Sequence, residues 1–88
     1  DLERFPNLKL ASEAWYLGGT AMACLNAANE VAVAAFLKGQ LSFLDIARLN
    51  QQVLERSDIK VVNDLEVVFE ADEQSRALAQ QLIASEFS

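Results

Sequence analysis

The sequence predicts an all-α fold, a small four-helix-type bundle with one additional short helix. Fourteen of the eighteen side chains from residue 20 to residue 37 are apolar, and a helix that is apolar nearly all round is typical of a buried central helix. Capping residues and glycines mark the ends of further amphipathic stretches on both sides of it. We find no internal repeat, low-complexity run or linker, so we expect a single domain over residues 1–88.

The first helix is predicted from about Asn7 to Leu17. Pro6 favours a helix start at or just after its own position, because its ring fixes φ and disfavours helix for the preceding residue. Glycine takes the left-handed conformation without strain, so the Gly18-Gly19 pair should end the helix. Its apolar residues form two adjoining stripes, Leu8, Ala11 and Trp15 on one and Leu10, Ala14 and Leu17 on the other.

The central helix is predicted to begin after Thr20 as N-cap and to run to about Lys38, where Gly39 stops it. Its interior polar residues are Asn26, Asn29 and Glu30, which are spaced i, i+3 and i+4 and so share one face. This polar notch has three readings from the sequence: a solvated strip, a hydrogen-bonded group within the core, or a docking site for another domain.

A third helix is predicted up to about Arg56. Ser42 with Asp45 three residues later resembles a capping box, although Glu or Gln is usual at the second position. We also expect Asp45 to pair with Arg48 across one turn. The apolar stripe of this helix consists of Phe43, Ile46, Leu49 and Val53.

The remainder of the chain is predicted to hold two helices. Residues 57–62 are ambiguous, because their β-branched side chains could form a short extended segment. Asn63 as cap, with Glu66 three residues on, predicts a short helix from about Asp64 to Phe69. Asp72 is predicted to cap a last helix from about Glu73 to Glu86, and the inward face of that helix would hold Leu78, Ala79, Leu82 and Ile83.

Composition argues against several classes of function. The chain has 88 residues, 52% of them apolar, with a net charge of −6, and an acidic surface disfavours nucleic acid as a partner. We do not expect a membrane span, because the polar notch lies in the middle of the most apolar stretch. The chain starts at Asp1 without an initiator Met, so it reads as a piece of a longer protein.

The sequence shows no catalytic, cofactor-binding or metal-binding constellation. It contains no histidine, and its single cysteine, Cys24, lies among apolar residues, as a core side chain does more often than a nucleophile. Gly18-Gly19-Thr20 precedes a helix but lacks the lysine and the spaced glycines of a phosphate-binding loop. The cluster Asp64, Glu66, Glu70, Asp72 and Glu73 lacks the glycine and alternating ligands of a calcium loop, and it suits helix N-termini instead.

Several motifs follow one another along the chain in a fixed order. They are Phe-Pro-Asn-Leu-Lys-Leu-Ala at 5–11, Gly-Gly-Thr at 18–20, Leu-Asn-Ala-Ala-Asn-Glu at 25–30, Val-Ala-Val at 31–33, Ala-Phe-Leu at 35–37, Phe-Leu-Asp-Ile-Ala at 43–47, Asp-Leu-Glu-Val-Val at 64–68, and Asp72 followed by Arg76 and Ala79. In this order they resemble the C-terminal region of one enzyme family, 1-deoxy-D-xylulose 5-phosphate reductoisomerase. The most specific motif is Leu-Asn-Ala-Ala-Asn-Glu with Gly-Gly-Thr before it, and Met22 is a departure, since many members carry proline there.

The resemblance implies a C-terminal helical domain of a larger bacterial, cytoplasmic and homodimeric enzyme. That enzyme uses NADPH and a divalent cation, Mg²⁺ or Mn²⁺, to convert 1-deoxy-D-xylulose 5-phosphate into 2-C-methyl-D-erythritol 4-phosphate in non-mevalonate isoprenoid biosynthesis. The family's cofactor, metal and phosphate motifs belong to its nucleotide-binding and catalytic domains, and none has a counterpart in this chain. We therefore expect this piece to be inactive alone and to support the catalytic domain of the same polypeptide.

We take Lys9, Asn26, Asn29 and Glu30 as the candidate residues of the docking face towards that catalytic domain. The alternative is a free-standing helical protein-interaction module. The two are distinguished by whether the reading frame extends roughly 300 residues upstream, as two further domains would require.

Overall fold

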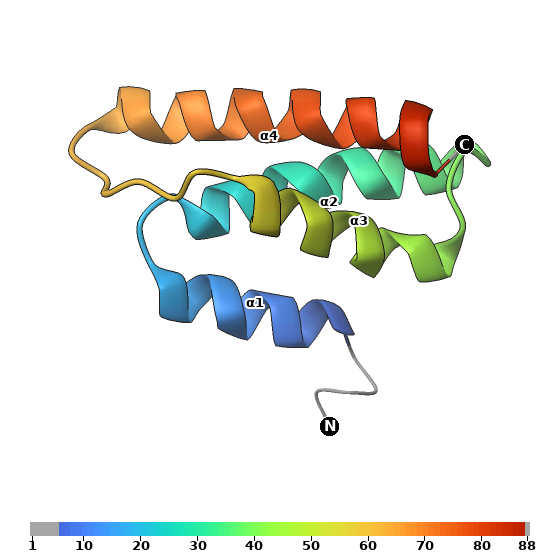
Figure 1. Cartoon of the computed structure of the whole chain (residues 1–88), viewed down its shortest axis with the longest axis horizontal. Helices are drawn as coiled ribbons and strands as arrows, with labels where there is room; N and C mark the ends of the chain where they lie inside the picture. The colour runs from blue at the N-terminus through green and yellow to red at the C-terminus, as the bar shows by residue number, and fades with distance from the viewer. Residues whose placement is uncertain (1–5, 88) are drawn as a thin grey trace.

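Four α-helices make up the computed structural model, which describes residues 6–87 (Figure 1). They are α1 (Pro6–Leu17), α2 (Ala21–Leu37), α3 (Phe43–Arg56) and α4 (Leu65–Glu86). The described residues contain no strand. The all-α prediction is confirmed, and the first three helices begin and end within a residue of the predicted positions. No described helix is both long enough and apolar enough to cross a membrane.

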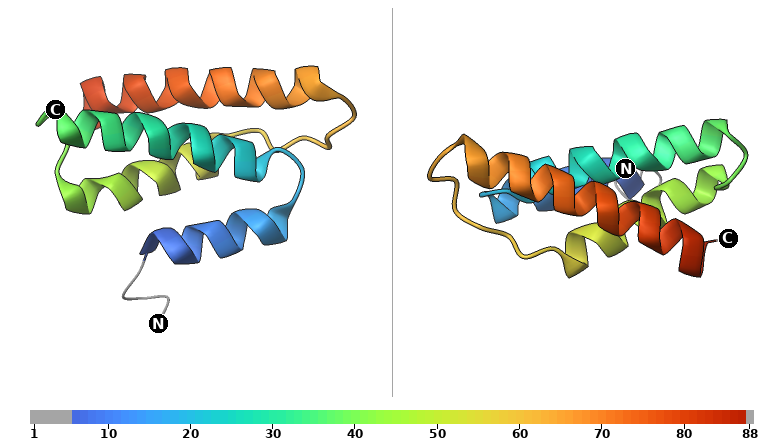
Figure 2. Two further views of the ribbon diagram at one scale, coloured as in Figure 1. Left: turned by 180° about the vertical axis from the view of Figure 1, so that it is seen from behind. Right: turned by 90° about the horizontal axis from the view of Figure 1, so that it is seen from above.

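The helices form three layers, with α2 and α3 in the middle, α4 on one side and α1 on the other (Figure 1). Among the described residues α1 packs on α2 and α3 but has no contact with α4. Seen from above, α4 crosses α2 obliquely (Figure 2). The central position predicted for α2 is confirmed, since it packs against all three other helices.

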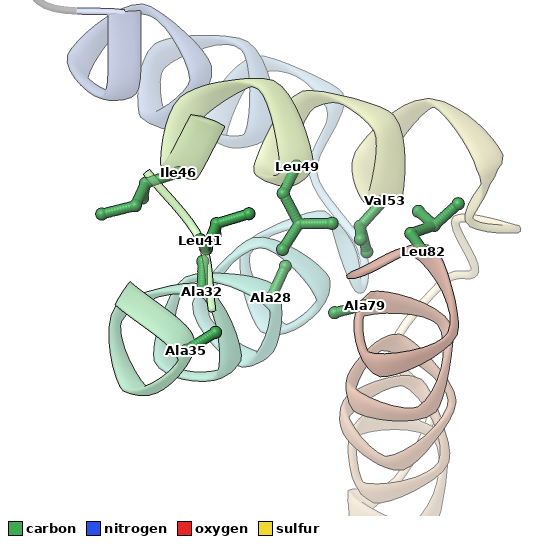
Figure 3. Packing of buried hydrophobic residues seen from close by; sticks show 9 residues of the cluster. All are labelled: Ala28, Ala32, Ala35, Leu41, Ile46, Leu49, Val53, Ala79 and Leu82. Atoms are coloured by element: carbon green, nitrogen blue, oxygen red, sulfur yellow. The ribbon is translucent and has the colours of Figure 1, made fainter. Parts of the chain in front are cut away.

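Two hydrophobic clusters fill the spaces between these layers. The larger one joins α2, α3 and α4, and Leu49 of α3 points towards Ala28 of α2 within it (Figure 3). Alanines on α2 let the neighbouring helices approach closely. The buried residues of this larger core are Ala28, Ala32, Ala35, Leu41, Ile46, Leu49, Val53, Ala79 and Leu82. The smaller core joins α1, α2 and α3 through Leu10, Ala14, Ala21, Leu25 and Leu54.

Local signals at the start of α3 and at the helix ends behave as predicted. The Ser42 hydroxyl accepts a hydrogen bond from the Asp45 amide at 3.2 Å, and Arg48 donates to the Asp45 carboxylate at 2.9 Å. Gly39 has a φ of +76° after the end of α2, in the left-handed region that favours glycine. Phe43 is an exception within the predicted stripe of α3, because it is 70% exposed.

Two helices predicted in the last third of the chain are in fact one. The expected short helix and last helix are both parts of α4, and Asp72 does not cap a helix there but accepts a hydrogen bond from Arg76 at 3.0 Å. No glycine or proline interrupts residues 64–87, so helical hydrogen bonding continues through Asp72. The cap is Asp64 rather than Asn63, since the Asp64 carboxylate accepts from the Val67 amide at 3.1 Å.

The ambiguous segment that leads into α4 is irregular rather than a strand. Ile59 packs on the smaller core, and Lys60 is held by Thr20 through two hydrogen bonds. The Thr20 amide donates to the Lys60 carbonyl at 2.9 Å, and the Lys60 amide donates to the Thr20 hydroxyl at 3.0 Å. Thr20 does occupy the N-cap position of α2, but its hydroxyl serves this tertiary contact and makes no cap bond, which corrects the role predicted for it.

Candidate functional site

The polar notch of α2 lies on the surface of the bundle, where it divides between two sets of partners. Asn26, Asn29 and Glu30 are all exposed. The Asn29 side chain accepts a hydrogen bond from α3, and the Glu30 carboxylate accepts one from α4. The structure thus favours neither a plain solvated strip nor an isolated core group: two of the three residues link neighbouring helices while remaining at the surface.

An asparagine cluster forms around Asn50 of α3, which is 1% exposed. Its Nδ2 donates to Asn29 Oδ1 at 3.0 Å and to Asn7 Oδ1 at 3.1 Å, so three helices meet at one amide group. Both hydrogens of that amide are used. The Asn50 Oδ1 atom is buried and has no hydrogen-bond partner among residues 6–87. A buried oxygen without a hydrogen bond lowers the stability of the fold, and the two hydrogen bonds donated by the amide group of Asn50 have to offset that cost.

A cleft of about 190 Å³ opens beside this cluster, between α1 and α2. Asn26 lies at this cleft, and its side chain makes no hydrogen bond to the other described residues. Its lining combines four asparagines with three apolar side chains: Asn7, Asn26, Asn29, Asn50, Ala11, Met22 and Leu25. Uncharged amides of this kind both donate and accept, as peptide groups do, so the cleft is suited to polar uncharged contacts rather than to ions.

Glu30 belongs to a separate ionic group on the other side of α2. It pairs with Arg76 of α4, which also donates to Asp72. Hydrogen bonds from Arg76 to Asp72 and then to Glu30 raise the pKa of the guanidinium above its ordinary value. The Arg76 side chain is 40% exposed, so this group contributes as a surface network does, weakly and subject to screening.

Lys9 lies in a different groove from the three notch residues. It lines a cleft between α1 and α3 together with Glu13, Leu44, Arg48 and Gln51. On α1 it is two residues from Ala11, which lines the asparagine cleft, and positions two apart face different sides of a helix. The structure therefore brings Asn26 and Asn29 together at one cleft, places Glu30 in a separate ionic group with Arg76, and places Lys9 in another groove.

Sequence reasoning missed Asn50, Asn7 and Arg76 as members of these groups. A signal for Asn50 was present, since it follows Ile46 by four residues and precedes Val53 by three, which puts it on the inward stripe of α3. A polar residue on an apolar stripe indicates a buried hydrogen-bonding group. Asn7 had no such signal, because it bonds to a helix distant in sequence, and Arg76 had a local signal only for its pair with Asp72, not for its pair with Glu30.

The acidic residues and the single cysteine were the sequence's remaining candidates for chemistry. No three His, Cys, Asp or Glu side chains gather there in a way that could hold a metal ion. The acidic residues noted in the sequence are accounted for in part by the cap at Asp64 and the ion pair of Asp72. Cys24 is 2% exposed, in agreement with its predicted place in the interior.

Comparison with known proteins gives one consistent family. The model of the DXP reductoisomerase C-terminal domain matches residues 1–78. The 1-deoxy-D-xylulose 5-phosphate reductoisomerase of Ectopseudomonas mendocina is 52% identical over 84 residues, which are 96% of this chain and 21% of that protein. The Photobacterium profundum enzyme of the same name is 49% identical over 83 residues, 94% of this chain and 21% of that protein.

A solved structure agrees with the sequence comparisons. The 1-deoxy-D-xylulose 5-phosphate reductoisomerase from Zymomonas mobilis, solved in complex with NADPH, superposes with a TM-score of 0.91 at 45% identity. The match covers 97% of this chain and 22% of that one. The chain thus spans about a fifth of the length of the relatives that it matches.

Proposed function

Because this chain belongs to the 1-deoxy-D-xylulose 5-phosphate reductoisomerase family as its C-terminal domain, we propose that it is the helical accessory domain of such an enzyme and supports the enzyme's catalytic domain. The observation that carries the proposal is the combination of near-complete coverage of this chain with coverage of only about a fifth of each relative. The parent enzyme would use NADPH and Mg²⁺ or Mn²⁺ to form 2-C-methyl-D-erythritol 4-phosphate for isoprenoid synthesis, as a homodimer in the bacterial cytoplasm.

The domain's own residues do not fit a role in that chemistry. The described side chains offer no cluster of metal ligands, and the buried polar groups are uncharged or already engaged within the bundle. NADPH and the metal ion would therefore be held by other domains. What this chain supplies is a folded support whose surface meets those domains.

The docking face proposed from the sequence includes Asn26, Asn29, Glu30 and Lys9. Support is strongest for Asn26, which is exposed at the asparagine cleft and whose side chain makes no hydrogen bond within residues 6–87. Asn29 and Glu30 would contribute through the parts of their side chains that remain exposed. Lys9 would take part from the neighbouring groove between α1 and α3.

A two-part assay tests the support role. The isolated chain is incubated with NADPH, Mg²⁺ and 1-deoxy-D-xylulose 5-phosphate while the absorbance of the reduced nicotinamide is followed, and we expect no turnover. A full-length reductoisomerase carrying this domain is then compared with a version truncated after its catalytic domain. We expect the truncated enzyme to melt at a lower temperature and to lose activity.

Two outcomes would contradict the proposal. Sustained turnover by the isolated chain would give it catalytic groups of its own. A truncated enzyme with unchanged melting and activity would show that the domain supports nothing, which would favour the free-standing interaction module instead.

A further inference from the structure

Helix α1 carries two apolar stripes, and the large side chains of one of them, Leu8 and Trp15, remain exposed although Ala11 between them packs against the smaller core. Leu10 and Ala14 are buried in the smaller core. The stripe Leu8, Ala11 and Trp15 has the spacing i, i+3, i+7 of a second helical face. Of these, Leu8 is 54% exposed and Trp15 is 80% exposed. A helix that is apolar on two sides is typical of one that is covered on both.

This exposed stripe adjoins the asparagine cleft. Ala11 belongs to the stripe and also lines the cleft, where it lies opposite residues of α2 that include Met22 and Asn26. The stripe and the cleft thus meet at Ala11, which lies between Leu8 and Trp15 along α1. Large aromatic side chains next to a few uncharged polar groups are typical of protein interfaces.

We infer that this surface, the Leu8–Ala11–Trp15 stripe with the asparagine cleft beside it, is covered by the domain that precedes this one in the same polypeptide. The inference rests on the proposed function. The matched family model describes a C-terminal domain, and about four-fifths of each relative lies outside the matched part. A C-terminal domain is joined to its protein through its first helix, and α1 is that helix.

The position of α1 in the fold supports the same occupant. It is the outermost layer of the bundle, it contacts only α2 and α3, and its free side faces away from α4 (Figure 2). If a preceding domain packed on this side, α1 would be buried between that domain and the rest of the bundle. The Asn26 amide would then meet polar groups of that domain beside the buried apolar contact.

Hydroxyl-radical footprinting with mass spectrometry tests the inference, because it reports the exposure of single side chains. Trp15 is the only tryptophan of the chain, so its oxidation is assigned without ambiguity. We expect oxidation of Trp15 to be at least fivefold slower in the full-length polypeptide than in the 88-residue chain. Phe43, which is 70% exposed on α3, serves as the reference and should react at a similar rate in both.

A pair of variants in the full-length polypeptide gives a second readout. Trp15→Ser should accelerate the proteolytic release of this domain severalfold, whereas Phe43→Ser should not. Trp15 is 80% exposed, so Trp15→Ser should leave the melting of the 88-residue chain unchanged, whereas Phe43→Ser removes the edge-to-face contact with Phe36 and should lower the melting temperature slightly. That last measurement shows whether the substitution has damaged the domain itself.

Each contrary result has a distinct meaning. Equal oxidation of Trp15 in the two proteins would overturn the inference, and if truncation of the domain still impaired the enzyme, the support role would stand with a different contact surface. Protection of Trp15 in the 88-residue chain that increases with its concentration would also overturn it, since a second copy would then be the occupant. If truncation had no effect and Trp15 stayed exposed, both proposals would fall.

Discussion

The two hydrophobic cores of this domain are built differently. In the larger one, alanines of α2 bring α3 and α4 close, and Leu49 and Val53 are completely buried between them. In the smaller one, α1 is attached through two buried side chains, Leu10 and Ala14, with the Asn7–Asn50 hydrogen bond beside them. The larger core packs α2 against both α3 and α4, whereas the smaller core lies beneath α1 and leaves Leu8 and Trp15 on the outer side of that helix exposed. Helix α1 therefore has one side that the bundle covers and one that it does not.

The largest expected effect comes from truncating the centre of the larger core. Leu49→Ala should lower the free energy of unfolding by about 2–5 kcal/mol, because the packed neighbours cannot collapse into the cavity. Leu10→Ala should fall at the low end of that range, about 2 kcal/mol, since α1 is free to move inward. Urea unfolding followed by circular dichroism measures both. Equal losses would mean that the two cores are equally rigid.

A second substitution tests the amide that joins the cores. Asn50→Asp replaces the donor with an oxygen facing the acceptors of Asn7 and Asn29, and it places a charge in the interior. We expect a loss of about 3 kcal/mol or more. Asn50→Leu keeps the branched shape and also removes the unpartnered oxygen, so it should cost only about 1 kcal/mol. Similar melting of the two variants would indicate that water reaches this site.

Substitutions in the polar notch should change stability less, and Asn29 and Asn26 should differ in this effect. Asn29→Ala removes one acceptor of the buried Asn50 amide and should destabilise the isolated chain by about 1 kcal/mol. Asn26→Ala is the matched control on the same helix face and should leave the isolated chain unchanged. In the full-length polypeptide the order should reverse for domain docking, with Asn26→Ala weakening it more. An unaffected melting midpoint for Asn29→Ala would reduce the asparagine cluster to a surface contact.

The smallest effect concerns the ion pairs of α4. Glu30→Gln removes one partner of an exposed arginine and should shift the melting midpoint by less than Asn29→Ala does. The raised pKa of Arg76 gives a contribution that is complete below the pKa of an unfolded arginine and is lost only as the pH rises through the higher folded pKa. Arg76 itself should therefore add no pH dependence to stability in the neutral range. Thermal melts at several ionic strengths check the size of the effect, which should shrink further in high salt.

Local signals in the sequence predicted the ends of the first three helices well. They did not predict that the last two expected helices are one continuous helix. Ser42 and Gly39 act through residues within one turn, so their roles could be read from neighbouring positions alone. Asp72 is equally suited to a cap or to a pair with Arg76, and Arg76 also pairs with Glu30 of another helix, which the local pattern does not contain. The same holds for Thr20, whose hydroxyl is used by a residue forty positions away.

The candidate site was also predictable only in part, because spacing along one helix can be read from the sequence and contacts between helices cannot. The notch residues were found because their spacing on one helix is a local property. Their partners Asn50 and Asn7 come from other helices, and the orientation of α1 decides which of its two stripes is buried. That choice is a tertiary one, and it left Leu8 and Trp15 outside where the pattern alone allowed either.

The contact between Thr20 and Lys60 has a consequence for how the chain tolerates changes in length. Lys60 is pinned, and a side chain at Gly19, where φ is +54°, would bring a carbon to 2.3 Å from the Lys60 carbonyl oxygen. An extra residue between Arg56 and Lys60 would therefore pull Ile59 out of the smaller core. Between Lys60 and the start of α4 the side chains of residues 61–64 are exposed. Doubling the length of this segment would cost only about 0.6 kcal/mol of loop-closure entropy. The connection between α3 and α4 thus has a segment of fixed length before Lys60 and a segment of variable length after it. The boundary between the two segments is set by Thr20, in the connection between α1 and α2.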